Sequence, residues 1–232
     1  MPRLLDLSHA VEAGMVTYKG LPGPVIRDHL SREASRALYA PGTSFQIGKI
    51  EMVANTGTYV DAPSHRWEDG ADLAGLSLDV LAGRPGICIA APHAQGLAVD
   101  SDFLEGEEVR GKAVLIHTGW AALWGTPSYF QRSSHLTAAA AALLVARGAA
   151  IVGIDSHNID DTDDKARPVH SILLRAGIPV VEHLCNLEAL PASGFRFYAV
   201  PVKVVGMGTF PVRAFAEIAE TAAAPEAQTG LP

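Results

Sequence analysis

Residues 137–155 read TAAAAALLVARGAAIVGID, and this stretch decides the fold class. It predicts a helix over residues 138–147, because Thr137 is a residue type favoured at the N-cap and Gly148 suits the position just past the helix end. The apolar run at residues 150–155 predicts a buried strand with a polar group at its carboxyl end. A helix that leads directly into such a strand is typical of a sheet covered by helices.

Elements on either side extend this pattern into a mixed α/β domain. A second apolar run at residues 113–118 (AVLIHT) precedes the helix and completes a β–α–β unit. Residues 45–53 (FQIGKIEMV) alternate apolar and polar types, and the slip of phase near Gly48 predicts a bulge in that strand. The remaining predicted elements are strands at residues 179–182 and 197–205 and helices at residues 169–176 and 213–220.

The composition is that of a globular chain. Its 232 residues suit one domain, and 48% hydrophobic with 19% charged residues provide ample material for a core. We expect one domain over residues 1–220 and a flexible tail over residues 221–232 (TAAAPEAQTGLP). No apolar run reaches about 18 residues, so no membrane partner is expected. The opening MPRLLDLSHA is too poor in apolar residues for a secretory signal.

Charge and cysteine usage narrow the expected setting further. The formal charge is −7 with a pI near 5.7, and no Lys/Arg cluster is present, so nucleic acid is not an expected partner. The two cysteines, Cys88 and Cys185, do not form a CxxC pair. Scattered cysteines indicate buried thiols in a reducing compartment rather than a disulfide framework. We therefore expect a cytoplasmic protein.

The candidate chemistry lies in residues 55–65, NTGTYVDAPSH, which directly follow the alternating strand. Gly57 permits backbone conformations that other residues resist, and Pro63 forces the chain out of regular structure. Alternate positions of an extended segment share one face. The polar side chains expected to gather on that face are Asn55, Tyr59, Asp61 and, after the proline, His65. Taken alone, these residues are equally compatible with ordinary turn caps.

The segment resembles the signature of the cyclase family, H-x-G-T-H-x-D-x-P-x-H, which includes bacterial kynurenine formamidase and isatin hydrolase. The positions that fit the signature are Gly57, Thr58, Asp61, Pro63 and His65. Further blocks that resemble the family lie at residues 6–9, 15–20, 153–156, 178–191 and 195–213, so the likeness covers nearly the whole chain. The resemblance implies an α/β fold of the swivelling β/β/α type found in kynurenine formamidase-like proteins.

The resemblance also implies a metal site. His170 and Glu182 resemble the family's two distal metal ligands, at the expected separation. The two leading histidines of the signature are absent, and Asn55 and Tyr59 stand in their places. An amide oxygen is a weaker ligand than imidazole, and a phenol must ionise to bind strongly. We therefore expect one divalent ion, zinc or manganese, held by Asp61, His170 and Glu182, with an open position for water.

The remaining signature residues are assigned around that ion. His65 matches the family's general acid/base, and an imidazole that titrates near neutral pH suits this role, although a fourth-ligand role stays open. Tyr59 and Asn55 are expected to donate hydrogen bonds to the substrate or to the developing oxyanion, and in the alternative that no metal binds they would supply the electrophilic assistance alone. Tyr18 matches an aromatic residue near the family's N-terminus that stacks on substrate, and a surface tyrosine is the alternative.

These assignments predict a hydrolase that resembles aryl formamidase. Metal-assisted water would attack an amide-like C–N bond of a small, aromatic substrate. The alternatives are a hydrolase or cyclase that acts on a lactone or other cyclic ester, and a binding protein that has lost catalysis, which the missing histidines would explain. The resemblance further implies a homodimer or a homotetramer.

Overall fold

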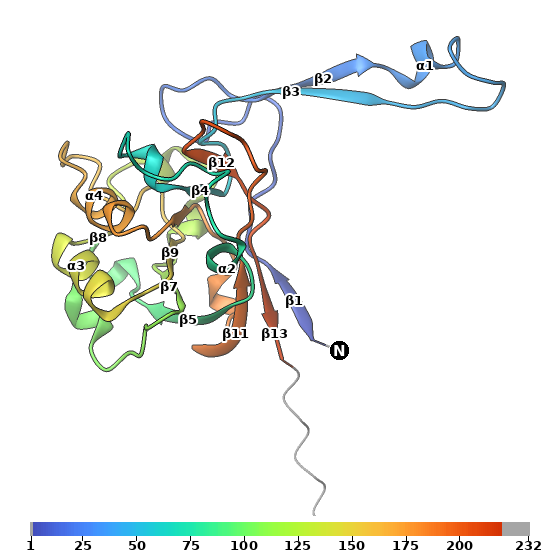
Figure 1. Ribbon diagram of the computed structural model, residues 1–232. Helices are drawn as coiled ribbons and strands as arrows, with labels where there is room; N and C mark the ends of the chain where they lie inside the picture. Colours follow the sequence, from blue (N-terminus) through green and yellow to red (C-terminus); the bar gives the residue numbers. More distant parts are fainter. Residues whose placement is uncertain (1, 220–232) are drawn as a thin grey trace, which may run out of the picture.

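The computed structural model describes residues 2–219 (Figure 1). Within these residues nine strands form one sheet, and the four central strands β5, β7, β9 and β10 run parallel. In sheet order the strands are β1 (Arg3–Asp6), β13 (Phe215–Ile218), β11 (Ser193–Tyr198), β5 (Arg84–Ala90), β7 (Ala113–His117), β9 (Ile151–Ile154), β10 (Val180–Glu182), β4 (Tyr59–Asp61) and β12 (Thr209–Pro211).

Helices and two small sheets complete the described chain. The small sheets pair β2 (Val25–Leu30) with β3 (Ile47–Glu51) and β6 (Ala98–Val99) with β8 (His135–Leu136). The α-helices are α1 (Arg32–Ser35), α2 (Leu78–Leu81), α3 (Ala138–Arg147) and α4 (Pro168–Arg175). The 3₁₀ helices are η1 (Pro63–His65), η2 (His93–Gln95), η3 (Ser101–Leu104), η4 (Trp120–Leu123), η5 (Pro127–Phe130) and η6 (Leu187–Ala189).

Helix α3 begins and ends where its sequence predicts. The Thr137 hydroxyl accepts a hydrogen bond from the Ala140 N–H at 3.1 Å, which satisfies a free donor of the first turn. Gly148 follows the helix in the left-handed region, with φ of 76°. The predicted strands on either side of α3 are also present, as β7 and β9.

The central sheet is buried on both faces. In β7, Val114 and Ile116 belong to one core cluster, while Ala113 and Leu115 belong to the other. This alternation follows the two-residue period of a strand, and it places helices α3 and α4 over the first face (Figure 1). A strand with apolar side chains on both faces reads as a continuous apolar run, which is the pattern that predicted it.

The sheet curls around the second cluster. That cluster joins Val60 of β4 to Ala216 of β13, although the two strands lie near opposite ends of the strand order. Backbone contacts join the segment after β1 to the segment after β10, because Ser8 bridges Leu184 and the Cys185 N–H donates to the Leu7 carbonyl at 3.0 Å. The curled, helix-covered sheet is the mixed α/β architecture that the sequence predicts.

Two predicted elements are wrong. The helix expected at residues 213–220 is strand β13, which pairs with β1 and β11. Val212, Ala214 and Ala216 are buried at alternate positions, so the segment follows a strand period rather than a helical one. The strand expected at residues 197–205 is displaced toward the N-terminus as β11. The expected tail at residues 221–232 lies outside the described residues.

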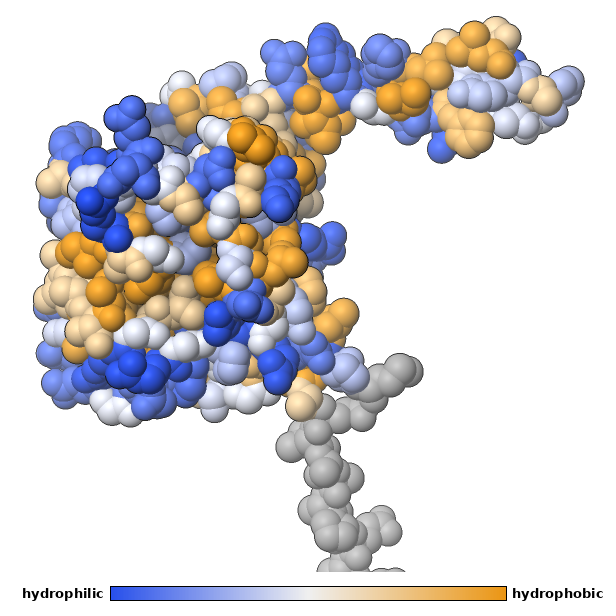
Figure 2. Space-filling view, viewed as in Figure 1, coloured by the Kyte–Doolittle hydropathy of each residue, from blue (hydrophilic) through white to orange (hydrophobic). Residues whose placement is uncertain are grey.

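Strands β2 and β3 form an arm that projects away from the body of the molecule (Figure 1). The predicted strand at residues 45–53 is thus present as β3, and the register slips between Asp28 and Leu30, opposite Ile47 and Gly48. Apolar side chains are exposed along this arm (Figure 2), namely Val25, Ile26, Leu38, Tyr39, Phe45, Ile47 and Ile50. The arm therefore has apolar surface that its own chain does not cover.

Two further findings bear on the expected setting. Cys88 and Cys185 are free thiols, and burial raises the pKa of each to about 12, so both are unreactive near neutral pH. Between residues 2 and 219, no helix has the length and apolar character that crossing a membrane requires.

Candidate active site

Strand β4 places the signature residues beside two other strands. Gly57 enters β4 with φ of 64°, a conformation that glycine adopts without strain. The antiparallel register sets Glu182 of β10 opposite Tyr59 and sets Thr209 of β12 opposite Asp61. Because alternate residues share a face, Tyr59 and Asp61 point to the same side of the sheet. Four polar side chains from three strands therefore meet on one buried surface.

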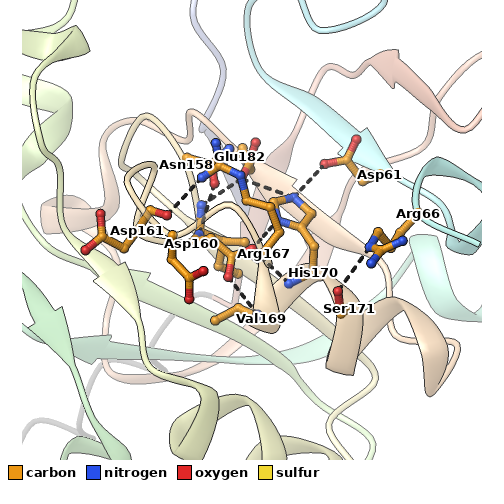
Figure 3. A network of polar contacts seen from close by, with 12 residues as sticks. Asp61, Arg66, Asn158, Asp160, Asp161, Arg167, Val169, His170, Ser171 and Glu182 are labelled. Carbon is orange, nitrogen blue, oxygen red and sulfur yellow. Dashed lines mark hydrogen bonds and ion pairs between the residues drawn. The ribbon is translucent and has the colours of Figure 1, made fainter.

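Helix α4 presents His170 to this surface (Figure 3). Its Nδ1 lies 2.6 Å from Asp160 Oδ2, and the Asp160 carboxylate also accepts the backbone N–H groups of Val169 and His170. A carboxylate partner requires that Nδ1 carry a hydrogen, which directs Nε2 toward the strands. There, His170 Nε2 lies 3.5 Å from Asp61 Oδ2 and 3.5 Å from Glu182 Oε1.

Three buried carboxylates surround this imidazole, and they require a cation between them. Burial alone lowers the pKa of His170, but the hydrogen bond to Asp160 and the charges of Glu182 and Asp61 raise it to about 10. Burial opposes ionisation of Asp160 as well, yet the hydrogen bond with His170 lowers its pKa. A proton on Nε2 supplies the compensating charge, and a divalent ion could replace that proton.

The donor set fits such an ion. Asp61 Oδ2 is fully buried and has no hydrogen-bond partner, an arrangement that costs free energy unless something pairs with the atom. Tetrahedral ligands at about 2.1 Å from a metal lie about 3.4 Å apart, close to the spacing between Asp61 and His170. Asp61, His65 and His170 also offer ligand atoms that all lie within 4.8 Å of one another.

Glu182 lies on the other side of His170 from Asp61 (Figure 3). Its Oε1 accepts the Ile159 N–H at 2.7 Å, and its Oε2 accepts the Tyr59 hydroxyl at 2.5 Å. Burial raises the pKa of Glu182 to about 7, opposed by the His170 charge and reinforced by that of Asp61. Burial and the charge of Glu182 raise the pKa of Tyr59 well above its usual value, so Tyr59 stays a neutral phenol. A neutral phenol is a poor metal ligand but a good donor to Glu182.

Thr209 links His65 to Asp61. The Thr209 hydroxyl donates to Asp61 Oδ1, and His65 Nδ1 lies 2.7 Å from the same hydroxyl oxygen. His65 Nδ1 is then the donor, which leaves its Nε2 free to accept a proton. Gly208 permits this approach, because a Cβ at that position would lie 2.5 Å from the His65 backbone nitrogen.

A cavity of about 270 Å³ opens onto this cluster. Its walls hold six of the seven residues singled out from the sequence, namely Tyr18, Asn55, Tyr59, His65, His170 and Glu182. The seventh, Asp61, is fully buried directly behind His170. The Thr17 hydroxyl donates to the Asn55 carbonyl at 2.8 Å, and this bond fastens the loop that carries Tyr18 to the cavity wall.

Sequence reasoning missed several residues of the site. Asp160 was not among the predicted site residues, but it is buried and orients His170. Thr209, Arg66, Asn158 and Arg167 gave no signal, although the first bridges Asp61 to His65 and the others line the cavity. The run P-V-H after Arg167 indicates the start of a helix, and the first N–H groups of a helix need acceptors. This signal could have pointed to a nearby acidic residue such as Asp160, which accepts the N–H groups of Val169 and His170.

Aromatic rings and histidines pack behind Tyr59. Tyr129 and His183 are fully buried, and the Tyr129 hydroxyl lies 2.9 Å from His183 Nδ1. Burial lowers the pKa of His183 well below its usual value and lowers that of His157 to about 4. Both ring nitrogens of His157 are buried without a hydrogen-bond partner. These imidazoles are neutral at physiological pH, in contrast to His170.

Comparison with known proteins gives consistent likenesses. A family model described as putative cyclase matches residues 5–161. The kynurenine formamidase of Delftia acidovorans is 27% identical over 212 residues, which cover 91% of this chain and 96% of the relative. That of Bacillus cereus is 28% identical over 213 residues, which cover 90% of this chain and 95% of the relative.

Solved structures resemble the chain over nearly its whole length. Isatin hydrolase A from Labrenzia aggregata has a TM-score of 0.81 at 22% identity, covering 94% of both chains. A structure described as a potential metal-dependent hydrolase with cyclase activity has a TM-score of 0.77 at 24% identity, covering 95% of this chain and 100% of the other. These likenesses confirm the predicted fold type.

Proposed function

The chain belongs to the cyclase family, and we propose that it is a metal-dependent hydrolase that cleaves an amide-like C–N bond of a small aromatic substrate. The proposal depends mainly on one observation: Asp61 Oδ2 is buried without a hydrogen-bond partner and lies 3.5 Å from His170 Nε2. The relatives named kynurenine formamidase and the structural neighbours named isatin hydrolase support this reaction class.

Asp61, His170 and Glu182 would hold one divalent ion, zinc or manganese. Two carboxylates and an imidazole suit either metal, and Asp160 fixes the ring of His170 for the purpose. When bound, such an ion polarises the substrate carbonyl and lowers the pKa of water. Tyr59 holds the Glu182 carboxylate in place, since its single O–H is engaged there.

His65 is the proton carrier in this proposal. Thr209 holds its Nδ1, so Nε2 faces the cavity and accepts the proton of the attacking water. The same atom then returns the proton to the nitrogen of the leaving group as the C–N bond breaks. Asn55 offers an amide donor to the substrate carbonyl oxygen, and Tyr18 offers a ring on which an aromatic substrate can stack.

Substrate profiling tests the reaction class. The purified protein would be assayed with an aryl formamide, a cyclic aromatic amide and an aromatic lactone, each beside its His65→Ala variant. We expect the amides to be the better substrates and the substitution to lower kcat roughly 10²- to 10⁴-fold. Preference for the lactone would favour the cyclic-ester reaction, and tight binding without turnover would favour a binding protein.

We propose that the chain assembles as a homodimer or homotetramer through its arm. An isolated two-stranded ribbon is marginally stable in water, yet this one exposes apolar side chains over its whole length. Ile47 and Ile50 are 49% and 56% exposed within a single chain, and a second copy would bury them. The cytoplasmic location inferred from the cysteines remains a prediction.

A further inference from the structure

Two arginines, Arg66 and Arg167, line the same cavity as His65 and His170. Figure 3 shows both arginines on either side of His170. Arg66 directly follows the proposed proton carrier at the end of η1, and Arg167 directly precedes helix α4. Neither belongs to the set that the cyclase resemblance singled out. A cavity that already contains carboxylates for a metal thus also carries two permanent cations on its wall.

Two contacts orient the exposed side chain of Arg66. Its Nε donates to the Ser171 hydroxyl at 3.1 Å, and its guanidinium lies 4.5 Å above the ring of Trp67. Trp67 is itself fixed, because its Nε1–H donates to the Ser171 carbonyl at 3.2 Å. These contacts use one edge of the guanidinium and leave its two terminal amino groups for a ligand.

Arg167 has a strained backbone conformation and an anchored side chain. It occupies the left-handed region, with φ of 49° and ψ of 59°, although glycine or asparagine adopts this conformation more readily. Its Nη1 donates to the Asp161 backbone carbonyl at 2.9 Å, which anchors the guanidinium beside the cavity. Because an arginine occupies this strained position, we expect its side chain to have a function.

Neither guanidinium is neutralised by a carboxylate. Among residues 2–219, no Asp or Glu oxygen lies within 4 Å of a nitrogen of Arg66 or Arg167, whereas neighbouring arginines are paired. Arg132 takes the Asp161 carboxylate at 3.0 Å. Arg175 takes the Asp69 carboxylate at 2.7 Å. The carboxylates of Asp161 and Asp69 are therefore paired with other arginines.

We propose that Arg66 and Arg167 bind a carboxylate on the substrate. Guanidinium groups pair with carboxylates through charge-assisted hydrogen bonds, and two of them from different elements fix both the position and the orientation of the anion. This inference rests on the proposed function and names its substrate class, a small aromatic amide that carries a carboxylate away from the scissile bond. The carboxylate lies at the cavity wall, and the amide reaches His65.

Matched substrates test the proposal. An aryl formamide with a ring carboxylate and its neutral carboxamide analogue would be compared through kcat/KM. The wild type should favour the anion roughly 10- to 100-fold. Arg66→Gln and Arg167→Asn should each lower that ratio at least about tenfold. Asparagine suits the left-handed backbone, so Arg167→Asn should melt no lower than the wild type. Arg196→Gln, an exposed residue bonded to Gly83, is the matched control and should keep the wild-type ratio.

If neither formamide is hydrolysed, the proposed function is wrong, but the role of the two arginines can still be tested by equilibrium binding. Benzoate and benzamide would be titrated into the wild type and into both arginine variants. We expect benzoate to bind at least about tenfold tighter than benzamide to the wild type, and the variants to lose this difference. Equal affinities in the wild type would overturn the proposal. A different result would also overturn the proposal. If formate inhibits the wild type but neither arginine variant, and the wild type does not prefer the anionic substrate, then the arginines bind the formate product and not a substrate carboxylate.

Discussion

Strands β4 and β3 lie close in sequence but differ completely in their surroundings. Every residue of β4 is buried, whereas every residue of β3 is exposed. Strand β4 has a partner on each edge, β10 and β12, while β3 has β2 alone. The residues of the candidate site are therefore gathered by pairing within the sheet, whereas the arm leaves apolar side chains that its own chain does not cover.

The largest expected effect falls on the buried strand. Asp61→Asn keeps the shape and the Thr209 contact but removes the charge that faces His170. We expect kcat/KM for the preferred amide to fall roughly 10³-fold or more and metal binding to weaken with it. Steady-state kinetics and elemental analysis measure both quantities. A variant that keeps its metal and its activity would place the chemistry elsewhere and would break the comparison.

The second effect falls on the exposed strand. Ile26 and Ile50 lie opposite each other in the arm, and Ile50→Glu would put a charge where we expect a partner chain. Since burial of an isoleucine side chain is worth about 1.5–3 kcal/mol, association should weaken roughly 10- to 100-fold. Sedimentation velocity over a concentration series measures this, with the exposed Lys49→Gln as the control in the same strand. A wild type that sediments as a monomer at all concentrations would contradict the assembly.

A smaller effect is expected at the edge of the site. Thr209→Val removes the hydroxyl that joins His65 to Asp61 without changing the side-chain size appreciably. We expect kcat to fall about tenfold with little change in KM, because the ring of His65 loses its orienting partner. Thr209→Ser should restore most of the rate. Equal losses in the serine and valine variants would show that the methyl group matters rather than the hydroxyl.

The last expected effect is a pH dependence of stability, which should change when a histidine of the body is replaced but not when a histidine of the arm is replaced. Burial, followed by the charge of Arg167, lowers the pKa of His157 to about 4, so the folded protein holds this ring neutral while the unfolded chain protonates it near pH 6.5. The unfolded state binds more protons between these values, and the free energy of unfolding therefore falls as pH decreases through that window, by at most about 1.4 kcal/mol per unit.

Urea denaturation at several pH values between about 4.5 and 6.5 separates the two regions. His157→Asn should flatten the decline in the free energy of unfolding relative to the wild type. The exposed His29 of the arm supplies the control, and His29→Asn should keep the wild-type slope. Identical slopes in all three proteins would show that burial of His157 has no consequence for stability.

The sequence predicts best where the signals are local. Helix α3 is predicted to the residue, because its cap, its apolar core face and its terminal glycine all lie within twelve consecutive positions, residues 137–148. The segment at residues 213–220 is predicted wrongly, since Ala214 and Ala216 are compatible with a helix and only the distant partners β1 and β11 make β13 a strand. Strand pairing between remote segments cannot be read from either segment alone.

The same limit applies to the site. The residues of the signature and its two distal partners do converge, and five of them line one cavity with Tyr18. Thr209 lies 148 positions from Asp61 and reaches it only through the pairing of β12 with β4. In the sequence, Asp160 belongs to an acidic run that is typical of a surface loop. In the structure, it is buried against His170 of helix α4. Such supporting residues become visible only once the register of the sheet is known.

We propose that Asp61, His170 and Glu182 of one chain hold a single divalent ion on which hydrolysis depends. Metal-stripped protein would be titrated with zinc or manganese, and calorimetry and the rate of formamide cleavage would be recorded in parallel. We expect one ion per chain, release of a proton as His170 gives up Nε2–H, and activity that rises in step with occupancy. Full activity in the stripped protein, or undiminished binding in Asp61→Asn, would contradict it.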